Sequence, residues 1–582
     1  MTTTRSGFTK LAAVCIAILL GAVVWELGWP LTRAEHEWSR LIAAVATLGH
    51  LTGILGSYFR KEINRPSLRL LIFQIISCLM IFLLIAREQQ EAGYMRFTEL
   101  SRLVITAGLI AIPTLMSLTR IFEWLVGKQK KGRPLMAPAM QFVASLGVVI
   151  LAGTGLLLLP NSTYPGITLS FTDALFTSTS AVCVTGLNAV DFAHTFTPLG
   201  EMFTLALIQI GGFGIMTFAY FVAMVAGQGF SLRDRVLLTD LLDEDNLGAV
   251  VSFITTIVVS TLFIELCGAV LLYFSWEGKD INLMGEPLWW HSLFHSVSAF
   301  CNAGFSTFPM NLMEPGIRLC YSGQAVIMAL IVCGGLGFGI YKEINSRLAN
   351  RFFSKHRRLH MQWTPYFKLV MISTGILLAG GALAIFAVSS PHAAEPLGEH
   401  LWICLFDSVT ARTAGFNISD YSRYLPAASL IMCGLMMVGG SPGGTAGGMR
   451  TTTCAIAGAE ILRILRGRDH VEFFRRRIDQ RTVARCVITV VVSCAWIGWF
   501  TVLICALEPS MSSLDIFFEN CSAFATVGVS RGITPDLSDP SKYLLIVNML
   551  AGRVGLFAFL IALAGTPTPR HYRYPSVKIP LT

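Results

Sequence analysis

Residues 171–191 read FTDALFTSTSAVCVTGLNAVD, a half-length apolar segment followed by a glycine, Gly186. Three later segments repeat this plan, each with a Ser/Thr-Ala pair before its glycine: WHSLFHSVSAFCNAGFSTFP (290–309, Gly304), WICLFDSVTARTAGFNISD (402–420, Gly415) and FFENCSAFATVGVSRGITP (517–535, Gly528). The four glycines recur with a period of roughly 115 residues, which indicates an internal repeat. The third copy is one residue shorter between its Ser/Thr-Ala pair and its glycine.

A second glycine series keeps the same register. The apolar segment after each loop carries GGFG (211–214), GGLG (334–337), GGSPGG (439–444) or GRVG (552–555). Two features that stay in step over four copies indicate a repeat rather than the self-similarity of apolar sequence. Each copy therefore predicts a span, a short re-entrant helix, a glycine loop and a second span.

The composition is that of an integral membrane protein. Of the 582 residues, 54% are hydrophobic and 14% are charged, whereas soluble domains carry about 25% charged residues. The net charge of +9 predicts no nucleic-acid partner, because the Lys and Arg residues concentrate in loops. The sequence contains no HExxH motif, nucleophile elbow or Cys/His cluster with metal-ligand spacing, so we expect neither an enzyme nor an organic cofactor.

The apolar segments predict twelve crossings of an inner or plasma membrane, both termini being cytoplasmic. The basic loops 60–69, 128–133, 231–235, 341–360 and 463–477 are expected inside, and residues 134–200 contain no Lys or Arg. The expected spans are 11–29, 41–59, 69–86, 102–126, 140–160, 201–226, 250–274, 321–341, 366–388, 425–462 (interrupted), 483–506 and 542–565.

The fold class expected is an all-α polytopic membrane protein with four pseudo-symmetric span–re-entrant loop–span repeats around one pore. The predicted units are extra N-terminal helices (1–133) and repeats at 134–230, 231–345, 346–470 and 471–582, the last with a short cytoplasmic tail. The N-terminal unit has no regular series of arginines, so we interpret its four helices as peripheral packing or assembly helices.

The four glycine loops are predicted to form an ion filter. Non-helical backbone at membrane depth must line water or be buried in protein. Backbone carbonyls of four loops can replace the hydration shell of a potassium ion, as in filters built from TVGYG, which ATVGV (525–529) approaches. The predicted filter residues are Val184, Thr185, Gly186, Asn302, Ala303, Gly304, Thr413, Ala414, Gly415, Thr526, Val527 and Gly528.

The motifs SAVCVTGL, FCNAGFST, ARTAGF and FATVG, together with GGSPGGTAGGMRTTT, resemble the membrane (pore) subunit of the Trk/Ktr-type potassium uptake systems, across residues 138–570. The resemblance implies an ion-conducting homodimer with a cytosolic nucleotide-binding regulatory ring. That ring would be a separate protein, because this chain has no GxGxxG motif after a strand. A serine at the first filter glycine accompanies sodium permeation in related sequences. Since all four positions here are glycine, the resemblance favours potassium.

The run VGGSPGGTAGGMRTTT (438–453), called here the glycine-rich run, interrupts the span of the third copy, where the other copies predict only a short glycine kink. The resemblance implies that this run blocks the pore below the filter and moves on activation, whereas a plain interrupted helix is the alternative. Arg450 is expected to anchor it to a carboxylate. The predicted gate residues are Gly439, Gly440, Ser441, Pro442, Gly443, Gly444, Thr445, Gly447 and Gly448.

Arg553 is the only charged residue between Tyr543 and Gly565. An arginine at mid-membrane costs at least about 2.5 kcal/mol, so such a residue usually faces a cavity or a partner. We interpret Arg553 as an electrostatic barrier in the pore, since the resemblance places the matching arginine there. The alternative is a structural ion pair with Glu265 or Glu519.

Other polar residues in apolar segments have less specific interpretations. Glu265 is expected to connect neighbouring helices. Asp173, Asp407 and Glu519 are expected either to make an outer vestibule negative or to cap helices. His291 and His295 have the i, i+4 spacing of metal ligands but no third ligand, which predicts vestibule or packing roles.

The leading hypothesis is potassium translocation, and the alternative is sodium or mixed monovalent transport. A secondary transporter of an organic solute would show inverted two-copy repeats instead of four copies in one direction. The basic loops are expected to contact anionic membrane lipid, to dock the regulatory subunit, or both.

Overall fold

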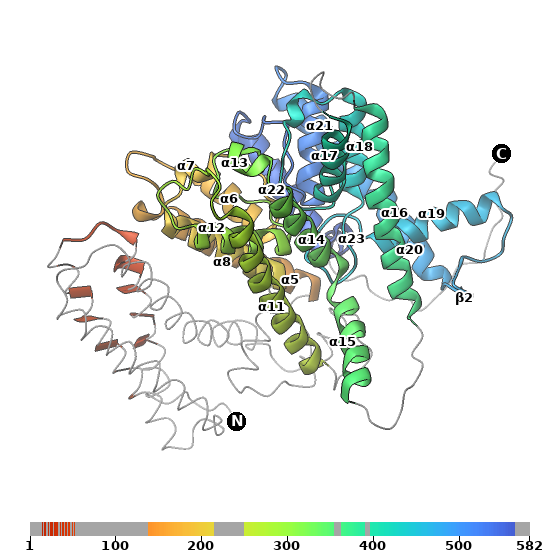
Figure 1. Ribbon diagram of the computed structural model, residues 1–582, viewed down its shortest axis with the longest axis horizontal. Coiled ribbons are helices and arrows are strands. Elements are labelled where there is room, and N and C mark those ends of the chain that lie inside the picture. Colours follow the sequence, from red (N-terminus) through yellow and green to blue (C-terminus); the bar gives the residue numbers. More distant parts are fainter. Residues whose placement is uncertain are drawn as a thin grey trace.

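The computed structural model of the protein describes residues 138–214, 250–353, 363–389 and 396–564, with scattered positions between residues 14 and 52. The described part is a bundle of helices (Figure 1). Its one sheet, among these residues, is an antiparallel hairpin of β1 (Glu472–Phe473) and β2 (Arg476–Arg477). The protein is therefore mostly helical, as predicted, apart from this hairpin in the expected cytoplasmic loop.

Some expectations lie outside the described residues. These are the spans at 69–86 and 102–126, the second half of the span 201–226, the basic runs before residue 138 and at 231–235, and the tail after residue 564. The first two N-terminal spans are described only at scattered positions.

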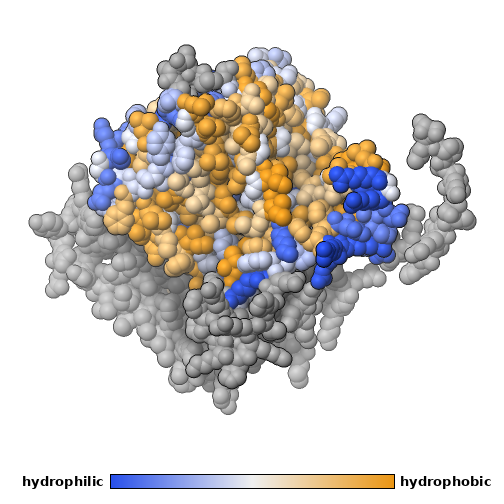
Figure 2. Space-filling model, turned by 45° about the vertical axis from the view of Figure 1, so that its right-hand side comes forward, coloured by the Kyte–Doolittle hydropathy of each residue, from blue (hydrophilic) through white to orange (hydrophobic). Residues whose placement is uncertain are grey.

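A long helix opens each copy, as the apolar segments predict. These helices are α5 (Pro138–Leu157), α11 (Val250–Trp276), α16 (Pro365–Val388) and α20 (Gln480–Leu507). Within the described ranges, the last three are long and apolar enough to cross a membrane. Their outward side chains are apolar and exposed, for example Phe263, Leu383 and Trp499. Figure 2 shows a face covered mostly by hydrophobic residues, which suits contact with lipid chains.

A short helix precedes each glycine loop. The four are α6 (Phe171–Cys183), α12 (Leu288–Cys301), α17 (Leu397–Thr410) and α21 (Ser513–Ala525). At 1.5 Å per residue each is about 20 Å long, too short to cross about 30 Å of hydrocarbon. Each buries a phenylalanine four residues before the Ser/Thr of the Ser/Thr-Ala pair: Phe176, Phe294, Phe406 and Phe518, all 0% exposed.

One polar residue on each short helix donates a hydrogen bond to a backbone carbonyl of the long helix before it. It stands two residues before the Ser/Thr of the Ser/Thr-Ala pair in every copy. The bonds run from Ser178 Oγ to Ile150 O (2.7 Å), Ser296 Oγ to Glu265 O (2.6 Å), Ser408 Oγ to Leu378 O (2.9 Å) and Asn520 Nδ2 to Ile497 O (2.8 Å). The same bond therefore holds the short helix at the same height in all four copies.

A second helix follows each loop: α8 (Pro198–Phe213), α14 (Tyr321–Leu336), α18 (Pro426–Met437) and α22 (Asp539–Val554). Three of them end at a glycine with positive φ: Gly214 (76°), Gly337 (88°) and Gly555 (91°). α15 (Phe338–Phe353) and α23 (Leu556–Ala564) then begin at the next residue in the second and fourth copies. The chain turns by 92° between α14 and α15, which confirms the short glycine kink expected at 334–337.

The remaining elements lie in the connections. They are η1 (Pro160–Ser162), α7 (Phe192–Thr195), η2 (Asn311–Met313), α13 (Pro315–Arg318), η3 (Tyr421–Arg423) and α19 (Thr451–Leu465). In Figure 1, α19 and the hairpin project from one side of the bundle, and α15 points away at the bottom. The core surrounds the short helices and the loops that follow them.

Candidate functional site: the glycine ring and the segment beside it

The four glycine loops share one backbone conformation. The residue two before each glycine is left-handed: Val184 (φ 57°), Asn302 (61°), Thr413 (71°) and Thr526 (52°). Gly186, Gly304, Gly415 and Gly528 have φ values of 89°, 68°, 80° and 91°. A non-glycine residue in this region costs about 1–3 kcal/mol and clusters at functional sites. Four such residues at one register mark these loops as a site.

The Ser/Thr of each Ser/Thr-Ala pair fastens the loop that follows. In the first and fourth copies its hydroxyl accepts a hydrogen bond from the N–H of the glycine: Gly186 N to Ser180 Oγ (3.0 Å) and Gly528 N to Ser522 Oγ (3.1 Å). In the second and third it donates to the carbonyl after the glycine: Ser298 Oγ to Phe305 O (2.8 Å) and Thr410 Oγ1 to Phe416 O (2.6 Å). The third copy, which is one residue shorter, differs locally. Its short helix α17 already ends at Thr410, and residues 411–414 form a turn that leads to the glycine.

The structure brings the four loops together in a closed ring, called here the glycine ring. A Cβ added to Gly186 would lie 3.1 Å from the Cα of Gly304, and one on Gly304 would lie 2.7 Å from that of Gly415. A Cβ on Gly415 would lie 3.3 Å from the Cα of Gly528, and one on Gly528 would lie 2.9 Å from that of Gly186. Each glycine thus touches the glycine of the next copy, and the fourth returns to the first.

Carbonyl oxygens occupy the contacts of this ring. The oxygen of the residue before each glycine, in Thr185, Ala303, Ala414 and Val527, lies against the glycine of the preceding copy. All twelve predicted filter residues are buried, and none carries a charged or titratable side chain. The chemistry that the ring offers is therefore ligation by neutral oxygen, which suits a cation stripped of water.

A cavity of about 440 Å³ opens on one side of the ring and is lined by Gly186, Gly415 and Gly528. Charged residues on its wall include Asp191, Asp420 and Arg531. Hydrogen bonds from Ser422, whose hydroxyl lies 2.6 Å from the carboxylate of Asp420, lower the pKa of Asp420. The cavity therefore keeps negative charge near the ring.

The three carboxylates expected in the vestibule do not line this cavity. Asp173 lies in the first turn of α6, where its carboxylate accepts from the hydroxyl of the N-cap residue Ser170 (2.8 Å) and pairs with Lys542 at 2.8 Å, in agreement with the capping alternative. Asp407 is buried and accepts from Tyr421 Oη (2.9 Å), and Glu519 accepts from Thr534 Oγ1 (3.0 Å). Buried carboxylates need donors from the protein, so they face the loop backbone and side chains behind the ring.

The glycine-rich run separates α18 from α19, so the predicted interruption is confirmed. Several of its backbone bonds lead to other copies. Ser441 N donates to Gly335 O (2.9 Å), and Gly448 N donates to Gly552 O (3.3 Å). Phe338 N donates to Gly443 O (3.0 Å). The run is thus held between the helix ends of the second and fourth copies.

The run lies directly against the ring loop of the fourth copy. A Cβ on Gly447 would collide with the side chain of Thr526, and one on Gly448 would lie 3.1 Å from the Cα of Ala525. The contacted residues, Thr526 and Ala525, come before Gly528 in the chain, whereas the cavity is lined by Gly528 and the residues after it. Glycine at 447 is therefore required by close approach and not only by flexibility.

Three arginines bond to carbonyls of this run. Arg553 donates to Thr445 O and also to Gly211 O of the first copy. Arg450 donates to Ala446 O, so its predicted carboxylate partner was wrong. Arg412 donates to Gly439 O at 3.5 Å.

The carboxylates that were the alternative partners of Arg553 are engaged elsewhere. Glu265 accepts from Gln209 Nε2 at 3.1 and 3.2 Å, which confirms its expected role between neighbouring helices. Glu519 accepts from Thr534 Oγ1 and the backbone N–H of Arg531. Sequence reasoning missed Arg412, although an arginine three residues before the glycine of a re-entrant segment was a usable signal.

The two histidines have packing roles. His291 Nδ1 lies 2.6 Å from Thr307 Oγ1, and His295 Nε2 lies 2.8 Å from Ser306 Oγ. Both rings stack on Phe308. In the described ranges, no group of three or more His, Cys, Asp or Glu residues is arranged to hold a metal ion.

Neighbouring copies are joined by one recurring polar bridge that sequence reasoning missed. A residue ten positions before the second glycine series contacts the next copy each time. The bridges are Trp290 Nε1 to Glu201 (2.7 Å), Trp402 Nε1 to Gln324 (2.6 Å), Arg531 Nη1 to Ser429 (2.6 Å) and Lys542 Nζ to Asp173 (2.8 Å). The recurrence of polar residues at this register was visible, but their partners were not.

Comparison with known proteins agrees with this architecture. A family model described as TrkH, cation transport protein, matches residues 102–574. Ktr system potassium uptake protein B of Bacillus subtilis is 34% identical over 446 residues, covering 74% of this chain and 94% of that protein. The potassium/sodium uptake protein NtpJ of Enterococcus hirae is 32% identical over 466 residues, covering 78% and 99%.

Among solved structures, the potassium transporter TrkH from Vibrio parahaemolyticus has a TM-score of 0.58 at 18% identity, covering 85% of this chain and 97% of that one. That likeness concerns the fold alone. The family match begins before residue 138 and includes the expected span 102–126, so it reaches further towards the N-terminus than the motifs indicate. The protein is a multi-pass membrane protein, and the chain belongs to the TrkH family of cation transport proteins.

Proposed function

We propose that the protein conducts potassium ions across the membrane through the glycine ring. The observation that carries the proposal is the closed circle of four glycines with a carbonyl oxygen from each adjoining loop at every contact. Such oxygens can replace the hydration shell of a monovalent cation without any change of protonation. The names of the Ktr relatives support potassium as the transported ion.

The glycine-rich run is the proposed gate of this path. It contacts the fourth loop before Gly528, on the side of the ring opposite the cavity. Its conformation depends on bonds to Gly335 and Gly552, which belong to other copies, and on the guanidinium of Arg553. Small movements of these helices would therefore release the run. Arg553 adds a positive charge beside the path, in keeping with an electrostatic barrier.

The repeat boundaries, orientation and partners are part of the same proposal. The four repeats are 134–230, 231–345, 346–470 and 471–582, with both termini and the hairpin (472–477) on the cytoplasmic side. The exposed residues Arg475, Arg476 and Arg477 of the hairpin and its turn agree with the positive-inside rule. The homodimer and the separate cytosolic regulatory subunit that the resemblance to the Trk/Ktr-type systems implies complete this proposal.

The test is growth of a cell deficient in potassium uptake at low external potassium, followed by ion flux in liposomes. The intact chain should restore growth and carry potassium into the vesicles. No potassium flux from monodisperse protein, or rescue on an organic solute instead, would reject the proposal.

Sodium or mixed monovalent transport is the second candidate. It is favoured by the relative NtpJ, whose name includes both ions. Competition between sodium and potassium in the same liposomes separates the two candidates. Potassium uptake that resists a large excess of sodium supports the first, and equal inhibition by both ions supports the second.

A further inference from the structure

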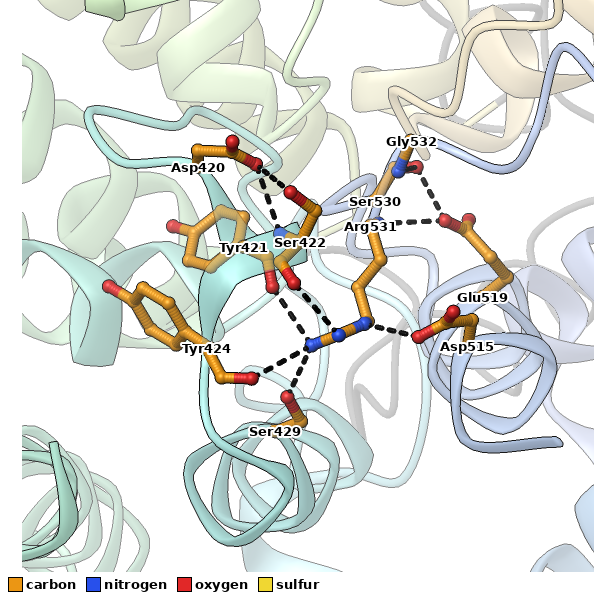
Figure 3. Close-up of polar contacts among 10 residues, drawn as sticks. All are labelled: Asp420, Tyr421, Ser422, Tyr424, Ser429, Asp515, Glu519, Ser530, Arg531 and Gly532. Carbon is orange, nitrogen blue, oxygen red and sulfur yellow. Dashed lines mark hydrogen bonds and ion pairs between the residues drawn. The ribbon is translucent and has the colours of Figure 1, made fainter. Parts of the chain in front are cut away.

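Arg531 stands three residues after the ring glycine Gly528, and its side chain lies between residues of the third and fourth copies (Figure 3). Its side chain is only 10% exposed, although it borders the cavity. A buried guanidinium needs partners for its five N–H donors, so its contacts show what it holds together.

The guanidinium joins the two copies. Nε donates to Asp515 Oδ1 at 2.5 Å within the fourth copy. Nη1 donates to Tyr421 O (2.9 Å) and Ser429 Oγ (2.6 Å), and Nη2 donates to Ser422 O (3.0 Å), all in the third copy. Figure 3 shows these bonds converging on one planar group.

The carbonyls of Tyr421 and Ser422 that Arg531 binds belong to η3 (Tyr421–Arg423). Tyr421 O also accepts from the backbone N–H of Tyr424 (3.2 Å), so the guanidinium adds a second donor to this oxygen. A planar fork of donors can serve several such oxygens at once, whereas a lysine ammonium has three donors at a single point. The site therefore specifies arginine and not merely positive charge.

The other copy boundaries use a direct bridge. Glu201, Gln324 and Lys542 each reach a side chain on the short helix of the next copy. The residue at the same register in the third copy is Ser429, whose side chain is much shorter. Arg531 spans the gap from Ser429 to Asp515 on α21.

The boundary between the third and fourth copies therefore differs from the other three, because the residue that bridges it, Arg531, belongs to a ring loop. The backbone N–H of Arg531 also donates to Glu519 Oε1 at 2.9 Å, which ties the same loop to the helix behind it. At this boundary, a Cβ on Gly415 would lie 2.6 Å from Val527 O. The position of Arg531 thus bears directly on the spacing of adjacent ring loops.

We propose that Arg531 is a positioning residue that sets ion discrimination by holding the fourth ring loop in register with the third. The inference rests on the proposed conduction through the ring. The guanidinium itself does not bind the ion, because it is a cation and has no acceptor atom. Without it, the loop after Gly528 loses its attachment to the third copy and the carbonyl spacing relaxes.

The test compares Arg531→Gln and Arg531→Lys with the control Arg423→Gln in potassium-flux liposomes with competing sodium. Arg423 lies near the same cavity, but its side chain is 75% exposed and pairs only with Asp420 at 3.1 Å. We expect Arg531→Gln to reduce the preference for potassium over sodium by about tenfold, which is the effect of losing one charge-assisted contact. Arg531→Lys should lose part of the preference, and Arg423→Gln should stay within about twofold.

The outcomes separate this inference from the function on which it rests. Size-exclusion profiles establish which variants assemble; if Arg531→Gln does not, Arg531→Lys carries the test. A wild-type preference retained in both Arg531 variants, or lower flux with an unchanged ion ratio, overturns the positioning role and leaves conduction intact. Wild-type protein without potassium flux overturns both.

Discussion

The second and third copies use their glycine series in opposite ways. In the second, α14 ends at Leu336, turns at Gly337 and continues at once as α15. In the third, α18 ends at Met437 and α19 begins only at Thr451. The second copy supplies carbonyls at Gly334 and Gly335, and the run of the third copy uses them as acceptors. A glycine turn that closes one helix thus also supports the irregular segment of its neighbour.

The difference shows how a segment with six glycines can be ordered inside a bundle of apolar helices. Unpaired backbone groups are costly there, so the run must take partners from its surroundings. Because those partners belong to several copies, the run is stable only while the copies keep their arrangement. The following predictions test this comparison, from the largest expected effect to the smallest.

Deleting Ser441–Gly448 should have the largest effect, because it removes most of the irregular segment that distinguishes the third copy from the second. We expect an assembled protein whose potassium flux rises by about tenfold or more, because the deletion removes the segment that blocks the path. A tenfold rise corresponds to about 1.4 kcal/mol in favour of the blocked state of the intact protein. The measurement is tracer flux in liposomes with protein that is monodisperse in detergent. An assembled but silent deletion would contradict the role of the run as a gate.

Arg553→Ala removes the donors to Thr445 O and Gly211 O. Hydrogen bonds from a charged group are worth about 1.5–3 kcal/mol each, so we expect a several-fold rise in flux and a looser run. The matched control is Arg463→Ala, which removes an i, i+3 pair with Glu460 on α19. If flux and thermal stability were both unchanged in Arg553→Ala, the interpretation of Arg553 as an electrostatic barrier would be wrong.

Gly447→Ala tests the close approach of the run to the fourth loop. The new Cβ would collide with Thr526, so we expect a loss of about 1–3 kcal/mol in stability together with higher flux. Gly434→Ala on α18 meets no neighbouring atom within 4 Å and should stabilise its helix by about 0.5–1 kcal/mol. The unfolding temperature in detergent is measured for both variants. Equal shifts in this temperature would show that Gly447 is no more tightly packed than Gly434.

Asp420→Asn should have the smallest effect. Removing one carboxylate from the cavity wall should weaken apparent potassium affinity by about twofold at low salt and less at high salt. Because the hydrogen bonds from Ser422 lower the pKa of Asp420, its charge persists as pH falls, and the effect should be the same at pH 7 and pH 5. An effect independent of salt would show that the carboxylate acts by contact instead.

The local features of the site were predictable because they repeat. The glycine register, the short helices before it and the interruption after Met437 all follow from residue spacing. The roles of individual polar residues were less predictable. Asp407 and Glu519 were expected near the vestibule but lie behind the ring, because burial requires donors that come from distant loops.

By itself, the sequence determined that this chain is a membrane protein with four copies of one helix–loop–helix plan, since apolar length and glycine spacing are local properties. Only the tertiary structure decided that each ring glycine touches the next copy, that Arg553 meets Thr445 and Gly211, and that Arg531 replaces the direct bridge at Ser429. These contacts join residues more than one hundred positions apart. Their partners are chosen by helix packing, which no local pattern encodes.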